Sequence, residues 1–197
     1  MLRKLLLLIF SRETGGNMAI LRRKTANPSD SKSIAAANLT NPESVIRLAS
    51  SMGIITVPFD LDNFIPKLGI ALNRVIMDND ISGKLEKNKS GVWEISVNAL
   101  HHPKRQRFTL AHELGHYFLH RNQSNLFTDK SLYRGKDMNS MEYEANNFAG
   151  AILMPKEELI SFMKESNDID NIADHFNVSA LAAKIRVEMI KRDYYAY

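Results

Sequence analysis

The chain has 197 residues, of which 44% are hydrophobic and 24% charged, so it is long enough for one sizeable core and short for two. It contains no cysteine, which excludes disulfides and thiolate metal ligands and fits a reducing cytoplasm. The net charge of +4 at pH 7 is mildly basic, and clusters such as residues 104–107 are interpreted as solvated faces rather than nucleic-acid surfaces. We therefore expect a cytoplasmic protein without direct nucleic-acid contacts.

Residues 1–40 are predicted to form a flexible lead. The chain starts MLRKLLLLIF, whose apolar run is shorter than the roughly 7 to 15 residues of a secretory signal and the roughly 20 of a membrane span. Residues 11–40 are rich in Ser, Asn, Thr, Gly and Lys and show little periodicity. We therefore place the folded domain at residues 41–197 and expect no membrane association.

Two short helices should open this domain. Pro42 stands near a helix start, and apolar residues spaced by three or four continue to a stop at Gly53. Asp60 or Asp62 can cap a second helix, which Gly69 would close.

A β-hairpin follows. Residues 81–86 and 92–97 alternate between apolar and polar side chains and flank a polar, glycine-containing turn. The pattern predicts a small antiparallel sheet. One hairpin strand could offer its edge to an extended peptide, or the hairpin could merely cover the core.

Residues 106–120, QRFTLAHELGHYFLH, show the spacing of a helix with one buried face and contain an H-E-x-x-H motif. Because residues four apart share a helical face, His112 and His116 can bind one zinc ion, with Glu113 beside the metal. Zinc held in this way activates water and polarises a carbonyl, while the glutamate takes the proton. The motif therefore indicates a hydrolase.

Two further residues of this helix are informative. Gly115 costs a helix about 1 kcal/mol relative to alanine, so another backbone or a substrate should approach it closely. His120 continues the line of histidines, but about 12 Å of helix separates it from His112. We expect His120 to be a packing residue rather than a ligand.

The third ligand should come from a second helix over residues 141–154, which ends before Pro155. Glu142 shares a helical face with small residues that permit close helix packing, whereas Glu144 points roughly the opposite way. Glu142 is therefore the predicted ligand, and Glu144 is the alternative.

Residues 172–186 have the pattern of a helix-turn-helix, with Asn177 at the turn and Ser179 as a cap. The second helix carries only two basic residues, which favours packing or partner binding over DNA recognition. A zinc hydrolase that attacks a carbonyl also needs a donor for the developing oxyanion, and the candidates are His175, Tyr133 and Tyr143.

The segments FTLAHELGHYFLH and EYEANNFAGAILMP together resemble the ImmA/IrrE family of metallopeptidases over about residues 42–190. The resemblance implies an α+β, zincin-like fold with a small antiparallel sheet, an active-site helix and a helical C-terminal part. It implies that His112, His116 and Glu142 bind Zn²⁺, with Mn²⁺ as an option in vivo, and that Glu113 is catalytic.

The resemblance also implies a biological role. Members of this family cleave helix-turn-helix (Xre-like) repressors and so relieve repression of stress-response, phage or conjugative-element genes. Asn146 matches a polar position of the family motif and could orient a liganding imidazole. The alternatives are a non-proteolytic regulatory or antitoxin-binding protein that retains the metal site, and a toxin that cleaves other proteins. Glu113 distinguishes an enzyme from a non-proteolytic binding protein, because a protein that only binds has no need of this carboxylate.

Overall fold

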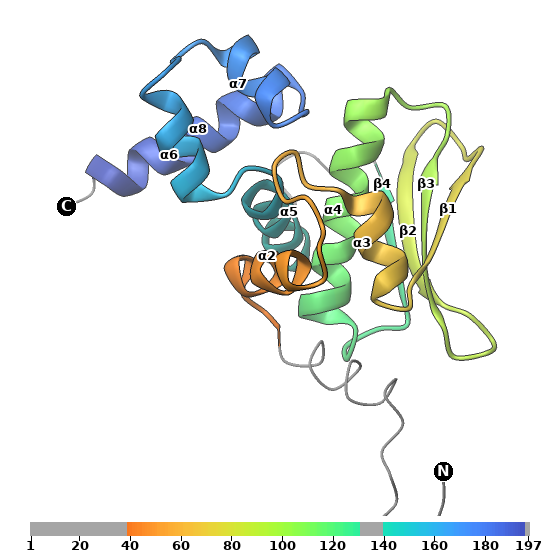
Figure 1. Cartoon of the computed structure of the whole chain (residues 1–197). Helices are drawn as coiled ribbons and strands as arrows, with labels where there is room; N and C mark the ends of the chain where they lie inside the picture. Colours follow the sequence, from red (N-terminus) through yellow and green to blue (C-terminus); the bar gives the residue numbers. More distant parts are fainter. Residues whose placement is uncertain (1–38, 131–139, 196–197) are drawn as a thin grey trace, which may run out of the picture.

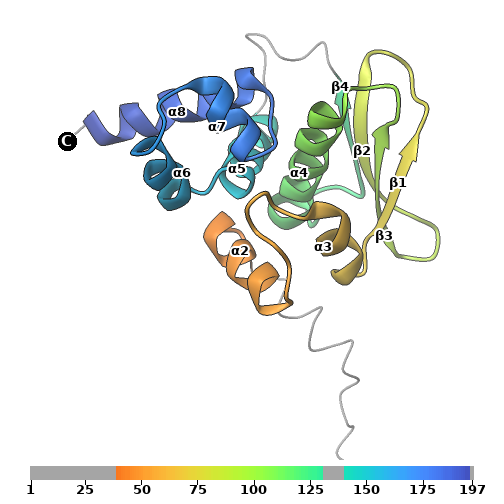
Figure 2. The same ribbon diagram turned by 45° about the horizontal axis from the view of Figure 1, so that its top comes forward.

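The computed structural model describes residues 39–130 and 140–195, which form a four-stranded sheet and a set of helices on one side of it (Figure 1). The central helix α4 (Pro103–His120) lies between the sheet and helix α5 (Ser140–Leu153), as Figures 1 and 2 both show. The α+β, zincin-like fold class is confirmed. Apart from residues 39 and 40, the predicted N-terminal lead lies outside the described residues.

The first two helices form where the sequence predicts them. Helix α2 (Pro42–Ser51) begins after Asn41, whose side chain accepts hydrogen bonds from the backbone N–H groups of residues 43 and 44. Helix α3 (Leu61–Lys67) is capped by Asp60, which accepts from the backbone N–H of Asn63. Gly53 and Gly69 adopt the positive φ angles of +72° and +79° that end helices.

The sheet has the strand order β1-β3-β2-β4. Its strands are β1 (Ala71–Val75), β2 (Ile81–Lys87), β3 (Trp93–Asn98) and β4 (Leu126–Lys130). The hairpin of β2 and β3 is confirmed as antiparallel, and β4 also pairs with β2 antiparallel.

The sheet is mixed rather than antiparallel throughout, because β1 pairs with β3 in parallel. The chain reverses direction twice between β1 and β3, so these two strands run the same way. They are also neighbours in the sheet. As a result both hairpin strands are interior, and neither can offer a free edge to a peptide. The edge strands are β1 and β4, and β4 lies beside α4.

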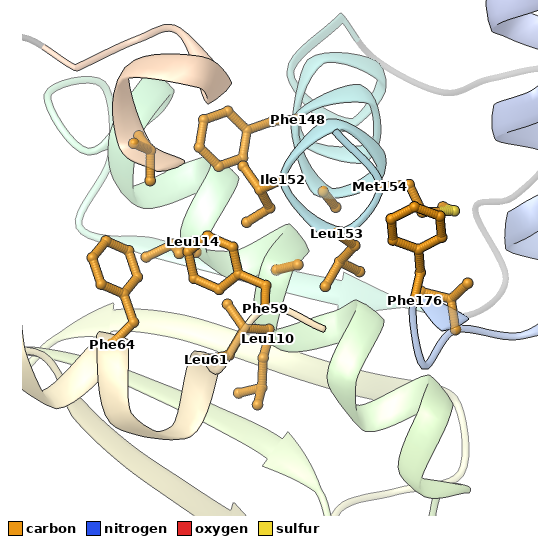
Figure 3. Packing of buried hydrophobic residues seen from close by; sticks show 14 of the residues in the cluster. Phe59, Leu61, Phe64, Leu110, Leu114, Phe148, Ile152, Leu153, Met154 and Phe176 are labelled. Atoms are coloured by element: carbon orange, nitrogen blue, oxygen red, sulfur yellow. The ribbon is translucent and has the colours of Figure 1, made fainter. Parts of the chain in front are cut away.

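Helices α4 and α5 pack along their lengths, and the main core lies around them. Figure 3 shows Leu110 and Leu114 of α4 close to Phe148 and Ile152 of α5, with Phe59 beside them. A Cβ atom on Gly115 would lie 3.1 Å from both Cα and the carbonyl oxygen of Ala145. The close backbone approach expected at Gly115 is therefore confirmed, and it comes from α5.

Three helices complete the described chain on the side away from the sheet (Figure 2): α6 (Lys156–Met163), α7 (Ile169–His175) and α8 (Ala180–Tyr195). Asn177 has a φ of +52° between α7 and α8, and the Ser179 hydroxyl accepts from the backbone N–H of Ala182. Arg186, one of the four basic residues on α8, donates to the Met154 carbonyl oxygen at 3.2 Å. This Arg186 contact joins α8 to the end of α5.

Among residues 39–130 and 140–195, no helix is long and apolar enough to cross a membrane.

Candidate metal centre

Helices α4 and α5 bring three candidate ligands together. The Nε2 atoms of His112 and His116 lie 3.0 Å apart. The two Glu142 carboxylate oxygens lie 3.2 Å from His112 Nε2 and 3.3 Å from His116 Nε2. Both histidines are buried, whereas Glu142 retains partial exposure. The structure thus brings the side chains of the three predicted ligands together.

This arrangement fits a zinc ion. Zn–N and Zn–O distances of about 2.0 to 2.1 Å in a tetrahedron separate neighbouring donor atoms by about 3.3 to 3.4 Å. The observed separations of 3.0 to 3.3 Å among His112, His116 and Glu142 are close to that spacing. Two imidazoles and one carboxylate also form the donor set of catalytic zinc sites that leave a fourth position for water.

The outer nitrogens of both imidazoles also have partners. His112 Nδ1 lies 3.0 Å from Asn146 Oδ1, which is the orienting contact predicted for Asn146. His116 Nδ1 lies 3.1 Å from Nδ1 of His120, and His120 Nε2 lies 3.2 Å from Glu144 Oε2. Glu144 therefore lies away from the three-ligand cluster, but its side chain reaches the same line of histidines.

Glu113 lies on α4 beside the cluster and is completely buried. Neither of its carboxylate oxygens has a hydrogen-bond partner among the residues that the structure describes. A Cβ atom on Gly83 of β2 would lie 3.1 Å from Glu113 Oε1 and 2.4 Å from the Thr109 methyl group. Glycine at position 83 thus lets the sheet approach α4 at the carboxylate. A buried acceptor with no protein partner is suited to take a proton from a water molecule.

The charges of these groups are coupled. Without a bound cation, burial raises the pKa of Glu113 to about 8, against the lowering effect of His112 and with added repulsion from Asp129 and Glu142. Burial lowers the pKa of His112, but the hydrogen bond to Glu142 and the charge of Glu113 outweigh it and raise the pKa to about 9. The pKa of Glu142 is held well below its usual range: burial alone would raise it, but the hydrogen bonds to both histidines prevail.

Asp129 of β4 is a neighbour that the sequence did not indicate. One of its carboxylate oxygens, a His112 ring nitrogen and a Glu113 oxygen all lie within 4.8 Å of one another. Asp129 adds negative charge on the sheet side of the site. It belongs to a strand that was not predicted, so no periodicity pointed to it.

The candidates for an oxyanion donor are not brought together with the ligands. The His175 ring stacks on Phe162 of α6, with ring centroids 4.0 Å apart, on the helices away from the sheet. Tyr143 is exposed on α5, and Tyr133 lies outside the described residues. The donor for the oxyanion thus has no assignment among these three residues.

An α+β fold in which an H-E-x-x-H helix packs against a second helix that carries a glutamate defines the zincin-like class. The chain belongs to the Peptidase_M78 family, described as IrrE N-terminal-like domain, whose model matches residues 67–188. It is similar to the radiation response metalloprotease IrrE of Deinococcus radiodurans, with 36% identity over 94 residues. That match covers 45% of this chain and 29% of the relative.

A solved structure titled Mycobacterium tuberculosis transcriptional regulator aligns with a TM-score of 0.49 and 17% identity, covering 80% of this chain and 50% of that one. The chain thus spans half or less of both proteins. The activity, substrates and partners of the whole relatives are therefore proposals for this chain.

Proposed function

We propose that the chain is a cytoplasmic zinc-dependent endopeptidase in which His112, His116 and Glu142 hold the metal and Glu113 is the general base. The proposal rests on the buried Glu113 carboxylate beside the three-ligand cluster, which has no hydrogen-bond partner within residues 39–130 and 140–195. Membership of a peptidase family supports it, and the cytoplasmic setting rests on a chain without cysteine.

The chain's own groups have separate tasks. Zinc bound here would lower the pKa of a water molecule and polarise the scissile carbonyl. Glu113 accepts the proton from the attacking water and delivers it to the leaving amine. Without a bound cation, burial raises the pKa of Glu113 to about 8; a zinc ion beside it would lower that pKa, so the carboxylate would be ionised and able to act as the base near neutral pH. Asn146 holds the His112 ring in place.

The proposed substrate is a protein, specifically a helix-turn-helix (Xre-like) repressor. The substrate assignment rests on the family resemblance of the two sequence motifs. An extended segment could pair with β4, because β4 is an edge strand of the described sheet and carries Asp129 next to the site.

The experiment is a cleavage assay with purified chain, zinc and the repressor encoded beside it. Wild type and the control Glu165→Gln, which changes an exposed carboxylate away from the site, should both produce fragments. Glu113→Gln should bind zinc and leave the repressor intact. If the repressor stays full length with wild type but its promoter is derepressed on co-expression, the chain acts by binding, and the regulatory alternative replaces the protease.

A further inference from the structure

His120 is buried one helical turn beyond His116, with 2% of its surface exposed. Its two ring nitrogens have different neighbours: Nδ1 lies 3.1 Å from His116 Nδ1, and Nε2 lies 3.2 Å from Glu144 Oε2. The three side chains form a line from the exposed Glu144 carboxylate to the candidate ligand His116. They come from two helices, since Glu144 lies on α5.

The hydrogen-bonding capacity of each group gives this line a direction. A carboxylate only accepts, so the hydrogen between Glu144 and His120 must sit on His120 Nε2. A neutral His120 then has a lone pair on Nδ1 and accepts a hydrogen bond from Nδ1–H of His116. This tautomer of His116 leaves the lone pair of its Nε2 atom free, and Nε2 is the atom that faces His112 and Glu142.

Packing restricts the His116 ring further. Phe127 of β4 stacks on it, with centroids 4.7 Å apart and planes inclined by 16°. Phe127 supplies no hydrogen bond, so it restricts the tilt of the ring but cannot select the tautomer. On the other imidazole, Asn146 plays the selecting role by accepting from His112 Nδ1. His120 is the corresponding group for His116.

We propose that His120 and Glu144 are positioning residues that fix the tautomer and ring orientation of His116 for metal binding. This inference rests on the proposed metal site. Ligating histidines generally donate their second N–H to a carboxylate, a carbonyl or water, and loss of that partner typically weakens metal affinity 10- to 100-fold. Here an intervening imidazole extends that contact to a carboxylate at the surface.

The test measures the dissociation constant for Zn²⁺ on the full chain, by competition with a chromophoric chelator at fixed pH. His120→Leu removes the acceptor and should raise the constant about 10- to 100-fold. His120→Asn places an amide oxygen near the position of Nδ1 and should keep it within about threefold of wild type. Rescue by asparagine is the readout that a merely space-filling role would not give.

The matched control is Phe118→Leu, a buried residue of the same helix whose ring packs against Tyr117 and Phe148. It should lower the thermal unfolding midpoint as His120→Leu does, while zinc affinity stays near wild type. Glu144 offers a surface variant that keeps the core intact. Glu144→Ala should weaken zinc binding less than His120→Leu, because water can replace an exposed acceptor, and Glu144→Gln should restore it.

Two results overturn the inference: equal zinc affinity in wild type and His120→Leu, or equal loss of affinity in His120→Asn and His120→Leu. Failure of the proposed function looks different. If wild type binds zinc and His120→Leu loses it, but no protein is cleaved, the positioning role holds and the peptidase assignment fails. If wild type binds no zinc, both fail.

Discussion

Substitution with alanine of Gly115 and Gly150, the two glycines within the helices that the structure describes, should have opposite effects on stability. Each exchange gains about 1 kcal/mol of helix propensity. At Gly150 of α5 the nearest atom to a new Cβ is Cδ of Arg186 at 3.8 Å, an ordinary contact. Gly150→Ala should therefore stabilise the protein by up to about 1 kcal/mol, which raises the midpoint of thermal unfolding by about 2 to 4 °C for a chain of this size.

At Gly115 the new Cβ would lie 3.1 Å from two backbone atoms of Ala145 and 3.3 Å from Phe148 Cδ1. Backbone atoms cannot rotate away, so α5 must move. Overpacking of this kind costs about 1 to 3 kcal/mol, which offsets the propensity and leaves a net destabilisation of about 0 to 2 kcal/mol. The displacement also moves Glu142 relative to His112, so zinc affinity should fall.

The assay is thermal unfolding of chelator-treated protein, followed by zinc titration of each variant. The two alanine variants should differ by about 1 to 3 kcal/mol, the range of the overpacking cost. Equal stabilisation by both, with unchanged zinc affinity at position 115, would refute the argument that the contact between α4 and α5 sets the geometry of the site.

Three further predictions concern the site itself. His112→Ala should lose the single zinc ion per chain that wild type retains after dialysis, as measured by elemental analysis. Glu142→Ala should weaken zinc binding far more than Glu144→Ala in a chelator competition, and the reverse order would make Glu144 the ligand. In chelator-treated protein the folded-state pKa values of His112 (about 9) and Glu113 (about 8) are raised, so the stability they contribute is present at low pH and is lost as pH rises through those values. The midpoint of thermal unfolding should therefore decrease as the pH is raised from 6.5 to 9, and it should decrease less steeply in Glu113→Gln. A midpoint that increases over this range would contradict the raised pKa values of both groups.

Local signals in the sequence predicted helices α2 to α5, the helix pair α7 and α8, and the hairpin, whereas α6 was not predicted as a separate helix. Caps such as Asn41 and Asp60 and the stops at Gly53 and Gly69 act over a few residues, so they can be read without the fold. The edge strands β1 and β4 were missed. Each has five residues and is held by pairing with a strand distant in the sequence, which local pattern does not reveal.

In the candidate site, too, the features set by local sequence were predicted and those set by the packing of distant segments were not. The helical spacing of His112 and His116 places them on one face from sequence alone. The contact between His120 and Glu144 could not be predicted from the sequence, because it depends on how α4 and α5 pack. From the helical spacing alone, Glu144 was expected to point away from the face of α5 that carries Glu142. Asp129 required the pairing of β4 with β2.

The most direct test of the account is the cleavage activity of zinc-loaded Glu113→Gln. This substitution keeps the size of the side chain and leaves the three proposed ligands in place, so the variant should bind one zinc ion per chain. Loss of the base removes proton transfer, which contributes typically about 10² to 10⁴ in rate, so cleavage of the repressor should fall by at least that order. Cleavage at the wild-type rate by the zinc-loaded variant would contradict the account.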